Sequence, residues 1–187
     1  MAHYETNTAT LTQNTTTMKN MIKVLALAAI VLGFASNSFA QVTATASTTA
    51  TIITPIAITK DVDMNFGNIA VSPTLGGTVV LPTSGARTLT GGVTLPVVTG
   101  TVTPASFTVT GEGNSTYSIT LPSSAITLTS GAGTMTVENF ISSPSNTGAL
   151  NNGTQEIKVG ATLNVGAAQA AGTYTNAAGL FVTVNYN

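Results

Sequence analysis

Paired acidic side chains are the first candidates for chemistry in this sequence. Asp61 and Asp63 stand two positions apart and could both offer carboxylate oxygens to Ca²⁺. A calcium site usually needs about six to eight oxygen ligands, which makes a solvated loop the favoured interpretation. Glu112 and Glu138 are the other pair that could act together, as the two carboxylates of a glycosidase do when they converge in one cleft. The sequence predicts no metal and no cofactor from these pairs.

The remaining reactive side chains are few. His3 is the only histidine, and the chain has no cysteine. Because His3 lies in a segment that we expect to be removed on export, the exported chain lacks the commonest general base and the strongest nucleophile. We therefore predict that the protein is not an enzyme.

Two further motifs favour a structural interpretation over a chemical one. Residues 111–116, GEGNST, are similar to a phosphate-binding loop, but the residues after them alternate like a strand, whereas such loops lead into a helix. A hairpin loop is the favoured interpretation. Arg87 could bind a carboxylate, but an isolated arginine more often keeps an edge strand soluble.

The first forty residues have the organisation of a Sec signal peptide. A positive region, an apolar run and a small-residue cleavage site follow one another. These lie at Lys19 and Lys23, at residues 24–34, and at Ser38 and Ala40. The eleven apolar residues would rise only about 16 Å as a helix, short of a hydrocarbon core of about 30 Å, so that no stable membrane span is predicted. We expect residues 1–40 to form a leader that is cleaved before Gln41, with Met18 as the true translation start. The exported chain would reach the periplasm, the cell surface or the medium.

Residues 41–187 carry few charges. Three basic and five acidic side chains give them a net charge of −2, whereas about a quarter of the residues are charged in an ordinary domain. Without a basic cluster the chain has nothing to neutralise phosphates, which excludes nucleic acid as a partner class. Without cysteine, burial and backbone pairing must hold an exported fold together unaided by disulfides.

Strand and turn residues fill this exported segment. Threonine occupies 30 of its 147 positions, mostly between Val, Ile, Leu and Ala, and β-branched residues suit strands better than helices. Gly, Pro, Asn and Ser interrupt the pattern at short intervals and leave about nine or ten short runs, one of which is DMNFGNIAV at residues 63–71. We predict an all-β domain over residues 53–187, a two-sheet antiparallel sandwich, with a small β-barrel as the alternative.

Alternation within the runs predicts which side chains face the core, since successive side chains of a strand point to opposite faces. The longest stripe consists of Ile157, Val159, Ala161, Leu163 and Val165. Shorter stripes are Tyr117 with Ile119 and Leu121, Phe107 with Val109, and Met135 with Val137.

The chain ends on another alternating run. Val182, Val184 and Tyr186 share one face and predict a C-terminal edge or core strand. No hairpin partner follows this strand, so its backbone must pair with an earlier strand or with another molecule.

Residues 41–52 alternate as well. The even positions hold a candidate assembly strand formed by Val42, Ala44, Ala46, Ala50 and Ile52, with Thr48 between them. Eleven extended residues span up to about 36 Å, enough to cross a sheet edge. Three interpretations stay open: an arm donated to another molecule, the first strand of the domain itself, and a linker.

Three segments carry a resemblance to known proteins: MNFGNIAV at 64–71, YSITLP at 117–122 and AGTYTNAAGLFVTVNYN at 171–187. They resemble a family of secreted bacterial all-β domains that has no assigned function. That family is similar to the spore coat protein U group, which includes subunits of archaic chaperone-usher pili. The pilin resemblance implies an immunoglobulin-like sandwich lacking one strand, whose groove is filled first by a periplasmic chaperone and then by the N-terminal extension of the next subunit. It also implies an aromatic residue near the C-terminus in the chaperone-binding strand, where Tyr186 stands.

The sequence thus favours a structural role outside the cytoplasm. We expect an exported subunit of a surface fibre or pilus-like assembly that pairs strands with further copies of itself, with a periplasmic chaperone as a second partner. Few charges and two terminal alternating strands leave edges that recruit other chains. The alternative is a monomeric adhesin-like or carbohydrate-binding module.

Overall fold

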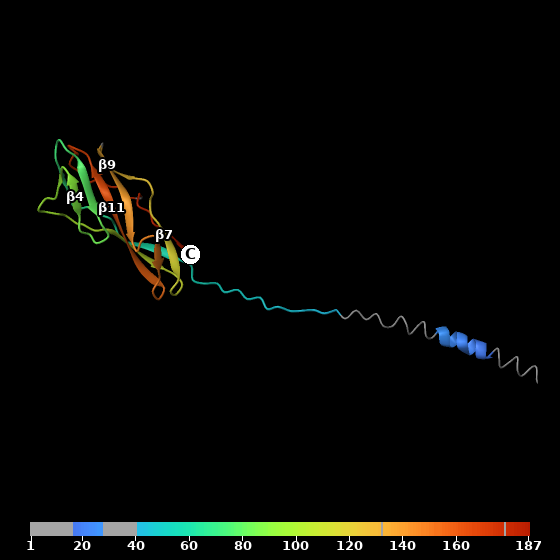
Figure 1. Ribbon diagram of the computed structural model, residues 1–187. Coiled ribbons are helices and arrows are strands. Elements are labelled where there is room, and N and C mark those ends of the chain that lie inside the picture. Colours follow the sequence, from blue (N-terminus) through green and yellow to red (C-terminus); the bar gives the residue numbers. More distant parts are fainter. Residues whose placement is uncertain (1–16, 28–40, 132, 178) are drawn as a thin grey trace, which may run out of the picture. The chain divides into compact units, whose positions relative to one another are not determined.

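The computed structural model describes residues 17–27, 41–131, 133–177 and 179–187. Residues 17–27 are helical, and no helix among the described residues is both long enough and apolar enough to cross a membrane. His3, the rest of the expected leader and the cleavage site after Ala40 lie outside the described residues. The chain divides into two units, residues 1–50 and residues 51–187, and the second is called the domain below (Figure 1).

The described part of the domain consists of strands and the loops between them. In chain order the strands are β1 (Ala57–Val62), β2 (Ala70–Val71), β3 (Gly77–Leu81), β4 (Thr88–Gly91), β5 (Val93–Thr94), β6 (Ala105–Thr110), β7 (Thr116–Thr120), β8 (Ile126–Ser130), β9 (Gly133–Ser143), β10 (Thr147–Ala149), β11 (Thr154–Val165) and β12 (Thr183–Tyr186). All the strand pairs are antiparallel. The expected antiparallel all-β fold is confirmed.

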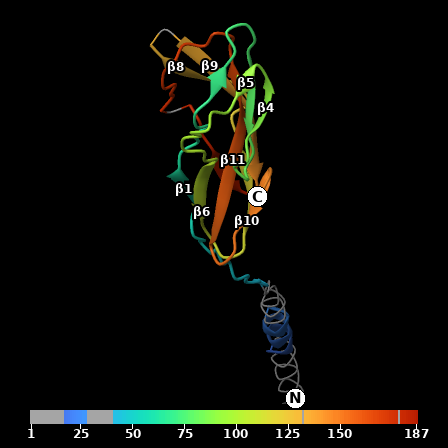
Figure 2. The same cartoon turned by 90° about the vertical axis from the view of Figure 1, so that its left-hand side faces the viewer.

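The strands form three sheets of unequal size. The largest has seven strands, in the order β1-β6-β11-β3-β4, with β9 and then β8 on the other side of β11. A three-stranded sheet has the order β10-β7-β12, and β2 pairs with β5. Figure 2 shows β1, β6 and β11 side by side, with β8 and β9 towards the upper end of the view.

Strand β11 is the central strand of the large sheet. Its first half pairs with β6 and its second half with β3, while β9 runs along its other edge. Gly160 lies at the change of partner, where the carbonyl oxygen of Leu81 approaches so closely that a Cβ atom would collide with it. A residue without a side chain at this position therefore allows β11 to pass from one partner to the next.

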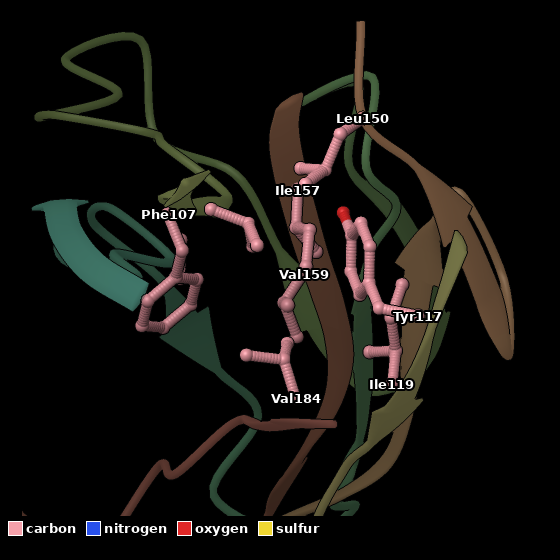
Figure 3. Close-up of a cluster of buried hydrophobic side chains, with 9 residues drawn as sticks. Phe107, Tyr117, Ile119, Leu150, Ile157, Val159 and Val184 are labelled. Atoms are coloured by element: carbon pink, nitrogen blue, oxygen red, sulfur yellow. The ribbon is translucent and has the colours of Figure 1, made fainter. Parts of the chain in front are cut away.

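Two clusters of buried side chains form the core, and β11 contributes to both. In the first, Ile157 and Val159 of β11 pack between Phe107 on the large sheet and Tyr117 of the small sheet (Figure 3). In the second, Ala161, Leu163 and Val165 of β11 lie inside the curl of the large sheet. They pack there with Phe66, Val79, Leu81, Val93 and Val137. The alternating stripe expected from Ile157 to Val165 is buried at every second residue, as predicted.

Two local expectations were wrong. The run at residues 63–71 is not one strand, because its backbone turns at Gly67, whose φ of 70° is left-handed, and only Ala70–Val71 pairs as β2. The loop at residues 111–116 does not close a hairpin, because β6 and β7 belong to different sheets. Residues 111–116 instead carry the chain from one face of the first core cluster to the other.

Candidate functional site

A half-open groove of about 1050 Å³ is lined by residues of the large sheet and of two loop segments beside it. One rim is the end of β1 with the chain after it, residues 60 and 62–69, and the other lies ahead of β12, at residues 172–177 and 180. The floor consists of apolar side chains from four strands of the large sheet: Ala105, Phe107, Ile126, Leu128, Met135, Val137, Phe140 and Leu163. Several of these side chains belong to the two core clusters, so the groove opens directly onto the core.

Each rim of the groove is continuous with a strand that ends its sheet. Strand β1 pairs with β6 alone, and β12 pairs with β7 alone. The outer edges of β1 and β12 are therefore without a strand partner among the described residues. An unpaired edge offers a row of backbone donors and acceptors to an added strand.

The C-terminal strand lies where it can cover the first core cluster. Val184 is buried opposite Ile119 of β7, and Tyr186 is paired with Tyr117. Val182 directly precedes β12 and is half-buried against the same cluster, as is Tyr186. The side chains of Thr183 and Asn185 are exposed.

The hydroxyl of Tyr186 joins three distant parts of the chain, in a set of contacts that we call the latch. It donates a hydrogen bond to the carbonyl oxygen of Thr54 at 2.8 Å and accepts one from the backbone N–H of Glu112 at 2.6 Å. The backbone N–H of Thr54 in turn donates to Oε2 of Glu112 at 3.0 Å. The latch thus ties the chain just ahead of β1 to the β6–β7 loop and to the end of β12.

The sequence around the latch accommodates the phenol. Gly111 lies directly under Tyr186, and a Cβ atom at this position would collide with the Tyr186 hydroxyl and touch Leu150. Pro55 follows Thr54 and holds it in an extended conformation, because the proline ring disfavours a helical conformation of the residue before it.

The latch affects the titration of Glu112. The hydrogen bond from the backbone of Thr54, followed by one from the Thr54 side chain, holds the pKa of the Glu112 carboxyl below its ordinary value of 4.5. Because the charged form is the better acceptor, these bonds stabilise the fold above the unfolded-state pKa. Their contribution is lost as the pH falls through the lower pKa of the folded state.

We expect a carboxyl titration by NMR to give Glu112 a lower pKa in the folded domain than in urea. In Thr54→Val only the side-chain hydrogen bond is removed, so the pKa should rise part of the way. Equal values for Glu112 in the folded and unfolded chain would contradict the contact between Thr54 and Glu112.

The N-terminal candidate residues lie outside every strand. Residues 41–56 have no regular secondary structure, and residues 41–55 are exposed. Val42 is 91% exposed and Ile52 is 98% exposed, and Ala44, Ala46 and Ala50 are exposed as well. The first strand of the domain begins at Ala57. No described strand pairs with residues 41–52. The role of these residues in assembly stays a prediction.

Arg87 organises one rim of the groove rather than binding a carboxylate. Its Nη1 donates to the carbonyl oxygens of Phe66 and Asn68. Gly67 between them has a left-handed backbone and leaves no room for a side chain beside the guanidinium. Sequence reasoning missed this role, because β4, which begins just after Arg87, and the rim that Arg87 holds have no common local pattern.

The acidic pairs are not assembled into a site. Asp61 accepts a hydrogen bond from the hydroxyl of Thr108, while Asp63 forms an ion pair with Lys60 at 2.7 Å. Glu138 accepts from the amide of Asn164 on β11, apart from the latch that holds Glu112. In the part of the chain that the structure describes, no three His, Cys, Asp or Glu residues are grouped so as to hold a metal ion.

Comparison with known proteins places the domain in a family. A family described as a domain of unknown function (DUF4402) matches residues 56–186, which run from the residue before β1 to the latch tyrosine. No curated protein and no solved structure matches the chain. Because the match covers most of the chain, this protein belongs to the DUF4402 family.

Proposed function

We propose that this protein is an exported structural subunit of a bacterial surface fibre or pilus-like assembly, built by strand pairing between copies. The arm, residues 41–52 of one copy, enters the groove of the next copy and pairs with the free edges beside it. The observation that carries the proposal is a groove that opens onto the core and whose two rims lead into strands lacking an outer partner.

The groove supports an extended peptide as its occupant. Its rims lead into β1 and β12, whose outer edges would offer backbone donors and acceptors to an added strand. Its floor is apolar, and side chains at alternate positions of an inserted strand would face that floor.

The arm has complementary features. Its even positions are Val42, Ala44, Ala46, Thr48, Ala50 and Ile52, all apolar except Thr48, and its odd positions are mostly Thr or Ser. Small side chains are suited to a floor that Phe107 and Phe140 already fill, since large and small residues interdigitate across a packed interface. The hydroxyl-bearing face would remain towards water.

Two further points support assembly with a chaperone as an intermediate partner. A groove that opens onto core side chains is a hazard in a free monomer, because exposed apolar surfaces and unpaired edges cause aggregation. An export chaperone that covers the groove until a second copy arrives would remove this hazard. Residues 64–71, 117–122 and 171–187 carry the resemblance to the spore coat protein U group and its pilins. That resemblance implies the same order of partners, first a chaperone and then the next subunit.

The alternative, a monomeric adhesin-like or carbohydrate-binding module, has one observation in its favour. Phe181 is 56% exposed and could serve as a stacking surface for a sugar ring. The other aromatic residues that the structure describes are buried or half-buried. A single exposed ring is a weaker basis for function than the groove.

A charge placed on the arm tests the proposal. We expect Ala46→Asp to abolish the large species seen in sedimentation of the wild type, because an unpaired carboxylate would be buried in the groove of the neighbouring copy. The thermal melt should be unchanged, since Ala46 is exposed and outside the strands of the domain.

The matched control is Thr45→Asp, which adds the same charge one residue away on the opposite face of the arm. This variant should still assemble. Assembly of Ala46→Asp to the same extent as Thr45→Asp would show that the arm is not the donated strand. Wild-type protein that stays monomeric at every concentration would favour the binding module instead.

A further inference from the structure

We propose that the latch makes strand donation intermolecular, by holding the root of the arm so that the arm cannot turn back into the groove of its own domain. The inference rests on the proposed function and assigns a positioning role to Tyr186 and Glu112 within it.

The latch engages both backbone polar groups of one residue at the root of the arm, Thr54. The N–H of Thr54 donates to Glu112 at 3.0 Å, and its carbonyl oxygen accepts from Tyr186 at 2.8 Å. The two side chains come from positions 58 and 132 residues further along the chain. Thr54 is therefore fixed to the domain from two directions.

Entry of the arm into its own groove would require a reversal of the chain at this place. Strand β1 continues into one rim of the groove and begins at Ala57, so that an arm lying beside β1 must turn within residues 53–56. The favoured two-residue hairpin turns need a positive φ at their first central position, which the ring of Pro55 cannot adopt and which the β-branched Ile53, Thr54 and Ile56 strongly disfavour. A longer turn would have Thr54 at its centre, so that Thr54 would have to leave Glu112 and Tyr186.

The arithmetic of tethering favours such a block in a copy whose groove no chaperone covers. A short flexible linker gives a tethered segment an effective concentration on the order of millimolar. Without a block, an arm attached next to the groove would fill it long before a second copy at micromolar concentration arrived. Fibre growth from dilute subunits therefore depends on excluding self-insertion.

The inference is tested on the exported chain with the double variant Tyr186→Phe and Glu112→Ala. Phe keeps the ring that packs against the first core cluster and removes only the hydroxyl, while Ala removes the carboxylate. The control is the double variant Tyr117→Phe and Glu156→Ala. It removes a hydroxyl bound to Gln155 and a carboxylate beside Lys158, both outside the latch and outside the lining of the groove.

Two measurements are made on each protein: sedimentation, and hydrogen exchange of the amides of residues 41–52 in the monomer fraction. In wild type and control we expect the arm amides of the monomer to exchange freely. In the latch variant they should be protected at least tenfold, and the fraction of large species should fall at least tenfold at the same concentration. Glu112→Ala alone replaces the double variant if the melt shows that Tyr186→Phe does not fold.

Hydrogen exchange of the arm amides tests the latch, and sedimentation tests whether the protein assembles into fibres. Freely exchanging arm amides in the latch variant, or amides already protected in the wild-type monomer, would overturn the latch whatever the sedimentation shows. Wild-type protein that never assembles would refute the proposed function. Under that outcome, protection confined to the latch variant would still establish that the latch prevents self-insertion.

Discussion

Deletion of residues 180–187 is expected to abolish the cooperative unfolding transition of the domain. The deletion removes β12 and four apolar side chains that pack against the first core cluster: Leu180, Val182, Val184 and Tyr186. Full burial of such a side chain contributes about 1.5–3 kcal/mol, and because Val184 is buried while the other three are half-buried, the four amount to about 4 kcal/mol at the lower figure. The lost pairing of β12 with β7 adds to this loss. The free energy of unfolding of a whole domain is about 5–15 kcal/mol. Circular dichroism during a thermal melt should show a broad, non-cooperative change.

Point substitutions separate the loss of packing from the loss of chain length. Val184→Asp places a carboxylate at a position that is 9% exposed and opposite Ile119, whereas Asn185→Asp places the same charge on the exposed face of β12. The first should unfold the domain or lower its melting temperature sharply, because a buried carboxylate without a partner is costly. The second should leave the melt close to that of the wild type. A truncated chain that melts cooperatively near the wild-type temperature would show that β12 is dispensable.

Local periodicity was enough to predict much of the core. The alternation from Ile157 to Val165 predicted one buried face of β11, and the pairs Tyr117 with Ile119 and Phe107 with Val109 are buried as expected. In each case the signal is carried by neighbouring residues of one strand, because a half-buried strand alternates with a period of two.

The division of β11 between two core clusters could not be predicted in this way. Ile157 and Leu163 belong to the same alternating stripe, yet one packs under the small sheet and the other within the curl of the large one. The difference is set by the partner strands, β6 for the first half and β3 for the second, and strand pairing is not encoded in a local pattern.

The candidate site could be predicted from the sequence even less well than the core. The groove is formed by segments from both ends of the domain, and the latch joins Thr54 to a tyrosine 132 residues away. Residues 63–71 were interpreted as one strand because the run lies between turn signals, whereas its backbone turns at Gly67, beside the hydrogen bond from the distant Arg87 to Phe66. Contacts between residues far apart in the sequence decided each of these features.

Truncation of Tyr117 is the second change for which we expect a large effect on stability. Tyr117 is among the largest side chains that are completely buried, and it lies at the centre of the small sheet between β10 and β12. Its hydroxyl donates to Oε1 of Gln155 at 2.7 Å, and the same oxygen accepts the backbone N–H of Ala149 at 2.9 Å. Burial raises the pKa of the Tyr117 phenol, which keeps it protonated as a donor. One side chain thus fills the core and ties β7 to β11.

We expect Tyr117→Ala to cost about 3–5 kcal/mol, as other substitutions of a buried aromatic residue by alanine do, and to lower the melting temperature by roughly 10–20 °C. Tyr117→Phe is the matched control, because it keeps the ring and removes one hydrogen bond, at a cost of about 0.5–1.5 kcal/mol. Gln155 would retain the N–H of Ala149 in that variant, so that its amide oxygen is not left without a donor. Thermal melts of the two variants beside the wild type measure both effects. Similar melting temperatures for Tyr117→Ala and Tyr117→Phe would mean that the hydroxyl, and not the packing of the ring, is what holds the small sheet against β11.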